Sequence, residues 1–137
     1  MSLVVDASMT IAWLFADERD ETPRTVLRRV AAEGAVVPSL WQLEVANVLR
    51  NAVRKKRCDA SYAGRCLQRL DRLRIVIDPE TDTHAWSSTW RLAQEHGLTA
   101  YDAAYLELAI RRGLPLASRD TAMIAAGIKV GVEIAGG

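Results

Sequence analysis

Short apolar runs alternate with longer amphipathic segments along the chain, and this alternation constrains the fold more than any other feature. The runs have strand length, and the segments between them space their apolar residues as helices do. Strands separated by helices pair in parallel and are covered by those helices. The sequence therefore predicts an α/β fold of three layers, a central mainly parallel sheet with helices on both faces. The five predicted strands are residues 2–6, 35–38, 74–78, 114–118 and 129–134.

Capping signals mark the ends of the predicted helices. Ser39 with Gln42 three residues later forms the pattern of a capping box, which opens a helix to about Lys56. Asp59 is expected to cap the next helix. Glycine ends the remaining helices, in the pattern that often closes a helix. These helices are residues 22–34, 81–97 and 99–113.

Length and composition indicate one globular domain, residues 1–137. Half of the residues are hydrophobic, and the formal net charge is +1, which neither requires nor excludes a nucleic-acid partner. Cys58 and Cys66 are too few for a zinc site or a disulfide scaffold, which favours a reducing compartment. No apolar run approaches the ~20 residues of a membrane span. We therefore expect a cytoplasmic protein without a membrane partner.

Four acidic residues stand in apolar surroundings, unlike most of the 17 in the chain. Two lie on helices, where Glu44 shares its face with Trp41 and Val48, and Asp102 shares its face with Tyr105. Neither has a basic residue three or four positions away. A buried carboxylate without a partner shifts its pKa or binds a cation. For Asp102 a capping box with Thr99 remains an alternative.

The other two acids, Asp6 and Asp120, follow predicted strands. Either could simply cap the helix that comes next. Asp78 also follows a strand, but Pro79 comes after it, so a turn is the better interpretation there. Ser8, rather than Asp6, is expected to start the first helix.

The predicted sheet would bring the four acids together at one edge. Parallel α/β sheets bind ligands beyond the carboxyl ends of their strands, close to a topological switch point. Asp6 and Asp120 would project there, and Glu44 and Asp102 can reach the same edge. Such a cluster would repel itself unless a divalent cation neutralised it. Ligation by oxygen alone suits Mg²⁺ or Mn²⁺, and such ions are typical of phosphoryl chemistry.

Four segments, in the order VVDAS, PSLWQLEVANVL, TAYDAAYLELA and LPLASRD, resemble the PIN-domain ribonucleases, specifically the VapC toxins of bacterial toxin–antitoxin pairs. The resemblance covers nearly the whole chain. It implies a metal-dependent endoribonuclease that cleaves RNA, forms a homodimer and is inhibited by a VapB-like antitoxin. The catalytic and metal-binding residues that it implies are Asp6, Glu44, Asp102 and Asp120.

The resemblance also assigns supporting residues. Ser8 and Ser118 match hydroxyl positions near the first and last acids, and Asn47 matches a position after Glu44. Some PIN domains carry a further acid shortly after the fourth, whereas Thr121 follows Asp120 here. Asp6 is expected to ligate the metal directly, with Glu44 acting through water or as the base.

Two rival functions stay open at this point. A phosphatase or receiver domain could use Asp6 as its phosphoacceptor, although neither explains an acid inside the apolar stripe of a helix. A binding module that has the PIN fold without catalysis is the other.

Some further residues have simpler interpretations. The run RKKR at 54–57 ends the helix of Glu44, where positive charge is favourable in any case, and RNA contact is the alternative. Arg119 is placed to contact phosphate or to pair with an acid. His84 and His96 receive no catalytic role. The four tryptophans lie on apolar helical faces and are expected in the core or at an interface: Trp13, Trp41, Trp86 and Trp90.

Overall fold

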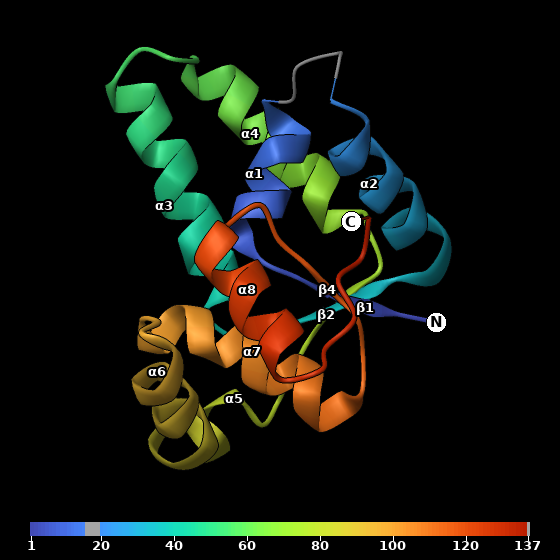
Figure 1. Ribbon diagram of the computed structural model, residues 1–137. Helices are drawn as coiled ribbons and strands as arrows, with labels where there is room; N and C mark the ends of the chain where they lie inside the picture. The colour runs from blue at the N-terminus through green and yellow to red at the C-terminus, as the bar shows by residue number, and fades with distance from the viewer. Residues whose placement is uncertain (16–19, 137) are drawn as a thin grey trace.

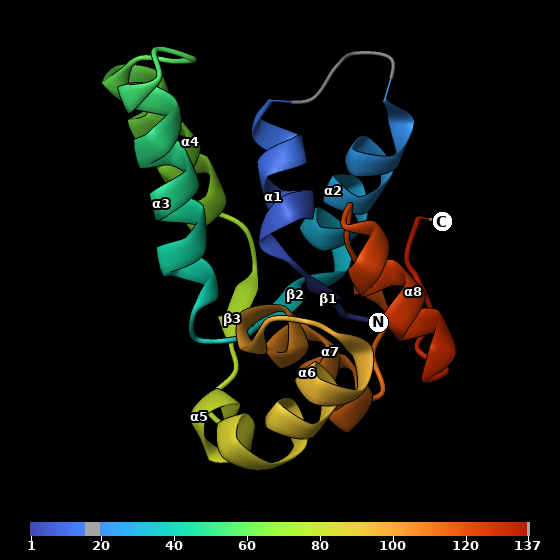
Figure 2. The ribbon, with the colours of Figure 1, turned by 60° about the vertical axis from the view of Figure 1, so that its left-hand side comes forward.

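A four-stranded parallel sheet lies at the centre of the computed structural model, which describes residues 1–15 and 20–136. The strand order is β3-β2-β1-β4, and all three pairings are parallel. Helices α1 to α4 lie on one side of the sheet and α5 to α7 on the other (Figures 1 and 2), which confirms the predicted α/β fold. The strands are β1 (Leu3–Val5), β2 (Ala35–Val37), β3 (Ile75–Ile77) and β4 (Leu116–Ala117).

At least two helices connect each strand to the next one in the chain. Two helices precede β3, as the sequence predicted. Two were also predicted before β4, but the first of them, at 81–97, is divided into three helical segments. In chain order they are α1 (Ala7–Leu14), α2 (Glu21–Glu33), α3 (Trp41–Arg54), α4 (Ala60–Asp71), α5 (Thr81–His84), the π-helical segment η1 (Ala85–Thr89), α6 (Trp90–His96), α7 (Ala100–Arg112) and α8 (Thr121–Lys129).

The core forms because β1, β2 and β4 are covered on both faces. All of their residues are buried, and they are Val, Leu and Ala, the continuous apolar pattern of strands between two helical layers. Helix α7 packs against β1 and β4 with its fully buried Leu106 and Leu108. Strand β3 lies at the edge, and its Val76 is exposed.

The predicted fifth strand at 129–134 is wrong. Lys129 is the last residue of α8, and Gly131 turns the chain with a φ of 82°. What remains of the expected pairing is one isolated parallel bridge between Ile134 and Leu116. The helix includes only Lys129 of the predicted strand, and the turn at Gly131 leaves the residues around Ile134 to pair with β4.

Most predicted helix ends are confirmed, but the predicted start of α3 is not. Asp59 accepts a hydrogen bond from the amide of Tyr62 at 2.7 Å, and Gly97 and Gly113 end their helices in the left-handed conformation. The capping box at Ser39 is wrong, because α3 begins at Trp41. The Ser39 amide instead donates to the Thr81 hydroxyl at 3.0 Å, so this turn is tied to α5 across the fold.

The tryptophans divide into two groups. Trp13 and Trp41 are buried in the core, as predicted. Trp86, on the π-helical segment, is 95% exposed and Trp90 is 58% exposed, which excludes the core for both. None of the helices in the described part of the chain combines the length and the apolar character that a membrane crossing requires.

Candidate functional site

The candidate site lies at the topological switch point of the sheet, beside β1. Strand β1 stands between β2 and β4, so the chain leaves β1 towards one side for β2 and returns on the other for β4. Such a switch point is where parallel sheets bind ligands. Asp6 follows β1 directly, and its amide donates to the carbonyl of Ala117 in β4 at 3.1 Å. Asp120 follows β4, so both acids stand at the same edge.

Asp6 is held by neutral donors. One carboxylate oxygen accepts from the Met9 amide at 2.9 Å and the Ser8 hydroxyl at 2.7 Å, and the other accepts from the Ser118 hydroxyl at 2.5 Å. The residue is only 4% exposed. Asp6 is thus the N-cap of α1, and the prediction that Ser8 starts this helix is wrong.

Burial raises the pKa of Asp6, and the charge of Asp102 raises it further. The three hydrogen bonds act in the opposite direction without cancelling this effect.

Ser8 and Ser118 join the two loops that carry Asp6 and Asp120. The Ser8 hydroxyl accepts from the Arg119 amide at 2.9 Å, and the Ser118 hydroxyl accepts from the Asp120 amide at 3.0 Å. Both serines therefore contact Asp6 while they orient the β4–α8 turn. Asp120 caps α8 through the Met123 amide at 3.0 Å.

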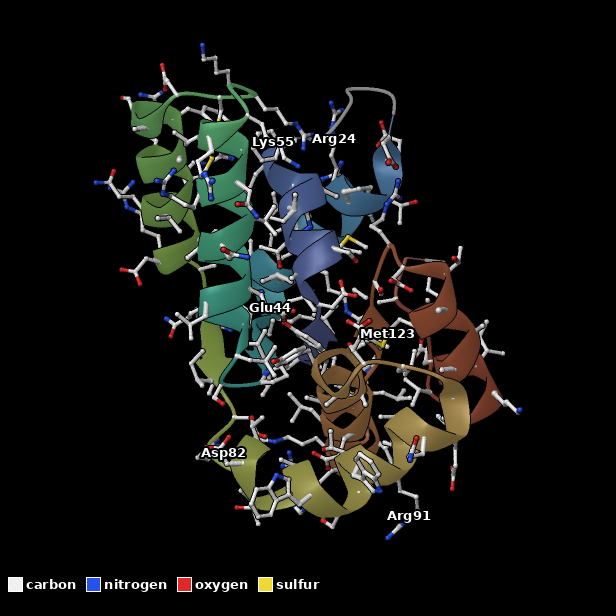
Figure 3. All side chains as sticks on the ribbon, turned by 90° about the vertical axis from the view of Figure 1, so that its left-hand side faces the viewer. Arg24, Glu44, Lys55, Asp82, Arg91 and Met123 are labelled. Atoms are coloured by element: carbon white, nitrogen blue, oxygen red, sulfur yellow. The ribbon has the colours of Figure 1, made fainter. Side chains whose placement is uncertain are left out.

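Glu44 approaches the site from the first turn of α3 (Figure 3). It is half-buried, and its carboxylate accepts a hydrogen bond from the Tyr105 hydroxyl at 2.6 Å. Burial raises the pKa of Glu44, and the charges of Asp102 and Asp6 raise it further, while Tyr105 lowers it. Burial together with Glu44 raises the pKa of Tyr105 above its usual range, so Tyr105 stays a hydrogen-bond donor.

Tyr105 is a site residue that the sequence analysis did not assign. It is fully buried in α7, one turn after Asp102. Its place on the same helical face as Asp102 was visible in the sequence. The missing information was that α3 and α7 bring Glu44 and this hydroxyl together.

Asp102 completes the group from the first turn of α7. Its amide donates to the Thr99 hydroxyl at 3.1 Å, so the alternative of a Thr99 cap is confirmed, but the cap does not neutralise the carboxylate. Burial raises the pKa of Asp102, and the nearby charge of Asp120 raises it further. Asp102 thus acts electrostatically on Asp6 and Glu44 and responds to Asp120.

The donor chemistry of this group fits a hard divalent cation. In the described residues no basic side chain forms an ion pair with any of the four acids, although three of them have raised pKa values. All potential ligands are oxygens, which Mg²⁺ and Mn²⁺ prefer. As the side chains stand, no three acidic, histidine or cysteine residues of the described part lie close enough together to share one ion. Some of them must rotate towards an ion for it to be bound by several.

Among the described residues, the side chains of Asn47 and Arg119 form no hydrogen bond or ion pair with the four acids of the site. Asn47 is exposed on α3, one turn beyond Glu44. Arg119 pairs with Asp20 at 2.5 Å, so the alternative of an acidic partner is confirmed for this arginine. The sequence could not choose between its two alternatives, because Asp20 is distant in the chain.

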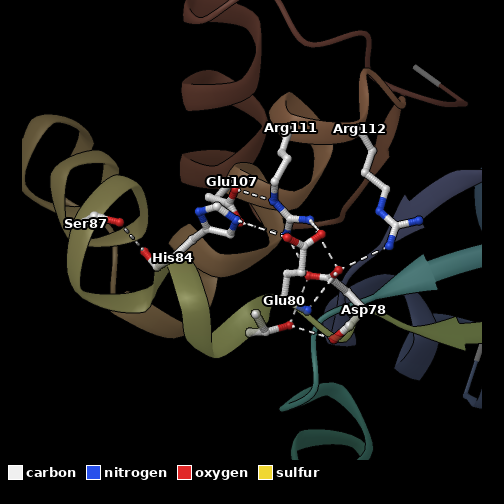
Figure 4. A network of polar contacts seen from close by, with 8 residues as sticks. Asp78, Glu80, His84, Ser87, Glu107, Arg111 and Arg112 are labelled. Carbon is white, nitrogen blue, oxygen red and sulfur yellow. Dashed lines mark hydrogen bonds and ion pairs between the residues drawn. The ribbon is translucent and has the colours of Figure 1, made fainter.

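A second acidic group surrounds Asp78, which follows the edge strand β3 (Figure 4). Asp78 is 1% exposed and accepts from Arg111 at 2.6 Å and Arg112 at 3.2 Å. Arg111 also contacts Glu107 at 2.8 Å and Glu80 at 3.6 Å. The predicted turn follows Asp78, but the ion pairs were not foreseen. His84 and His96 lie outside the four-acid site: His84 is in α5, within 4.0 Å of Glu80, and His96 ends α6.

Comparisons with known proteins agree with this architecture. The PIN domain family profile matches residues 3–129. Ribonuclease VapC3 of Pyrobaculum aerophilum is 31% identical over 120 residues, which are 88% of this chain and 90% of that protein.

Two solved structures have a similar fold. PAE2754 of Pyrobaculum aerophilum superposes with a TM-score of 0.69 at 28% identity, and the match covers 92% of this chain and 79% of that one. A toxin–antitoxin complex from Klebsiella pneumoniae gives a TM-score of 0.60 at 20% identity and covers 88% of each chain. From the profile and the identity to VapC3, the chain belongs to the PIN-domain family and to its VapC group.

Proposed function

We propose that this protein is a divalent-metal-dependent endoribonuclease, the toxin of a type II toxin–antitoxin pair. The observation that carries the proposal is the set of acids at the switch point of the sheet. Burial raises the pKa values of Asp6, Glu44 and Asp102, and the charge of another acid in the group raises each of them further. Perturbed acids with convergent charge and no cationic partner among the described residues are typical of an active site. The VapC3 relative is named a ribonuclease, which supports RNA as the substrate.

The roles of the acids follow from how each is held. Asp6 is fixed by two serine hydroxyls and an amide, so it is the best-oriented ligand for Mg²⁺ or Mn²⁺. Asp102 and Asp120 would complete the ligand set. A bound ion supplies Lewis-acid chemistry, which acidifies water and offsets the charge that develops on the scissile phosphate.

Glu44 is suited to a different role from Asp6. Burial raises the pKa of Glu44, and a raised pKa makes its carboxylate a stronger base for accepting a proton from water. Tyr105 holds one of its oxygens, so the other is available. We assign Glu44 as the base or as a ligand through water, and Ser8 and Ser118 as the residues that orient Asp6.

Cleavage of RNA in the presence and absence of chelator tests the proposal. The protein expressed alone should generate new RNA ends with Mg²⁺ or Mn²⁺, and chelator should abolish them. Asp102→Asn should lower the rate at least about a hundredfold, the scale of losing a group that stabilises transition-state charge. Asp59→Asn, which alters an acid outside the site, is the matched control and should keep the activity. Full metal-dependent activity of Asp102→Asn would exclude this assignment.

A second experiment tests the rival function, in which Asp6 is a phosphoacceptor. Both Asp6 oxygens accept hydrogen bonds, and the residue is nearly buried, which disfavours a covalent aspartyl phosphate. Trapping of an acyl phosphate on Asp6 would favour a phosphatase or receiver domain instead. A folded protein that binds RNA without cleaving it in any divalent metal would favour the binding module.

The partners that we propose are a VapB-like antitoxin and a second copy of the chain, in the cytoplasm. The likeness to a toxin–antitoxin complex supports the first. The exposed Trp86 offers an apolar contact for the second copy of the chain. Co-expression with a candidate VapB-like antitoxin, followed by size-exclusion chromatography with light scattering, tests both. A stable monomer that binds no antitoxin would contradict both proposals.

We also propose that residues 1–137 form a single PIN domain.

A further inference from the structure

The hairpin of α3 and α4 carries a large net positive charge. Residues 50–74 contain nine Lys or Arg and two Asp, a formal charge of +7, whereas the complete chain has +1. Every one of these nine side chains is exposed. They are Arg50, Arg54, Lys55, Lys56, Arg57, Arg65, Arg69, Arg72 and Arg74.

These cations differ from most arginines elsewhere in the molecule. Within the described residues, none of the nine lies within ion-pair distance of an acid, and the carboxylate of Asp59 is already used to cap α4. The arginines outside the hairpin that pair with acids are Arg24, Arg28, Arg29, Arg111, Arg112 and Arg119. Favourable charge at the end of α3 explains one or two cations there, but not an unpaired group of this size.

Part of this charge lies on the same face of α3 as Glu44. Asn47, Asn51 and Lys55 follow Glu44 by three, seven and eleven residues, the spacing of one helical face, and all three are exposed. Figure 3 shows Glu44 near one end of α3 and Lys55 at the other. At 1.5 Å per residue the face extends about 16 Å from Glu44. Arg54 and Lys56 flank its far end. We call these five residues the α3 stripe: Asn47, Asn51, Arg54, Lys55 and Lys56.

We propose that the α3 stripe binds the phosphate backbone of single-stranded RNA and guides it to the acids at Glu44. The proposal rests on the proposed function, since it assigns the substrate of the same site. The four acids repel a polyanion, so the RNA needs cations outside the site to offset that repulsion. Arg111, Arg112 and Arg119 are compensated by acids and cannot fill this role.

The composition of the stripe favours RNA over an acidic protein. The two amides, Asn47 and Asn51, lie between Glu44 and the three cations at the far end, and amide and cationic side chains are both common donors to phosphate oxygens. The stripe also leads directly to the proposed base, as a substrate track must. An acidic polypeptide would need no such continuity with Glu44.

Binding of a short fluorescein-labelled single-stranded RNA, measured by anisotropy in chelator, tests the stripe without requiring cleavage. The variant Arg54→Gln/Lys55→Gln/Lys56→Gln removes three cations from the stripe. Arg65→Gln/Arg69→Gln/Arg72→Gln removes the same charge from α4 and is the matched control. If all three stripe cations contact phosphates, the salt slope of log K falls by about 2, and the affinity at 0.1 M salt falls by up to about a hundredfold. The control should lose less than about threefold, from bulk charge alone.

Two outcomes would contradict the proposal that the α3 stripe binds RNA. Equal losses in both variants would mean that only the bulk charge matters, and an unchanged salt slope in the first variant would mean that its cations contact no phosphate. Polyglutamate that competes as well as RNA for the wild type, and less well for the stripe variant, would assign the surface to an acidic protein. Cleavage assays with Mg²⁺ keep the two proposals apart. If the wild type binds RNA through the stripe but never cleaves it, the proposed function fails while the stripe stands.

Discussion

Two buried aspartates each follow a strand of the same sheet, yet their surroundings are opposite. Asp78 follows β3 and is 1% exposed, and Asp6 follows β1 and is 4% exposed. Asp78 is neutralised by Arg111 and Arg112. Asp6 accepts hydrogen bonds from two serines and an amide, and no cation of the described chain pairs with it.

The direction of each pKa shift follows from this difference. Burial alone raises the pKa of both carboxyls, but hydrogen bonds and charge from the two arginines reverse its effect and lower the pKa of Asp78. The group around Asp78 is therefore complete within the protein. The group around Asp6 retains negative charge that a ligand can neutralise. Buried acids of the first kind support the fold, and those of the second kind support a site.

Removal of Arg111 should have the largest effect on stability. Arg111→Met leaves Asp78 and Glu107 buried with much of their partner lost, and breaking a buried pair in this way costs about 3–5 kcal/mol of unfolding free energy. Urea denaturation monitored by circular dichroism measures the loss.

Arg119→Met is the matched control for this variant. It breaks the more exposed pair with Asp20, and such surface pairs contribute about 0–1 kcal/mol. Similar losses for the two variants would show that the Asp78 group is not a structural ion-pair network.

The sequence alone could not distinguish Asp78 from Asp6, since both follow an apolar strand. The difference comes from Arg111, which is 33 positions after Asp78 and reaches it only through the tertiary fold. Glu44 and Asp102 were more informative because their helical neighbours are set locally, and no basic residue was among them. Tyr105 was missed because its hydrogen bond joins it to Glu44, a residue 61 positions earlier on another helix.

Prediction of the fold was also reliable for local patterns and failed where contacts distant in the chain decided the outcome. Four strands could be located from buried apolar runs between helices, because that pattern is local. The fifth was wrong, since α8 extends to Lys129 and the chain turns at Gly131, so only Ile134 forms a bridge to β4. The capping box failed because Ser39 donates its amide to Thr81, a residue that follows β3. Short motifs predict elements well and predict poorly which competing contact is formed.

Divalent metal should stabilise the group around Asp6 and leave that around Asp78 unaffected. At one hundred times its dissociation constant, an ion that binds only the folded state adds about 2.7 kcal/mol. Thermal melts with and without Mg²⁺ should show this gain in the wild type and in Asp59→Asn, but not in Asp102→Asn. A gain of equal size in Asp102→Asn would place the ion elsewhere.

Tyr105→Phe should have a smaller effect, on the order of 1 kcal/mol in stability, from the loss of one hydrogen bond. Its more specific consequence concerns Glu44. The Tyr105 hydroxyl lowers the pKa of Glu44, so without it that pKa rises further. The acid limb of the rate–pH profile should then move to higher pH if Glu44 is the base. Tyr62→Phe, which removes a hydroxyl outside the site, should leave the profile in place. An unmoved limb in Tyr105→Phe would remove Glu44 from that role.

The smallest expected effect is on the pH dependence of stability, measured in chelator, in which Asp102 and Asp78 should differ in sign. Asp102 has a raised pKa, so above its ordinary value of 3.8 the folded state holds more protons than the unfolded state. Stability from this group is therefore lost as pH rises through the folded pKa.

Asp102→Asn should accordingly be slightly more stable than wild type near neutral pH, and the gain should vanish in acid. Asp78 has the opposite sign, because its pKa is lowered and its contribution is lost as pH falls. The deficit of Arg111→Met should thus also narrow in acid, as Asp78 becomes protonated in the wild type and its ion pair is lost. Urea titrations across the acid range measure both differences. An Asp102→Asn protein that is less stable than wild type at neutral pH would mean that this carboxylate stabilises the fold as Asp78 does.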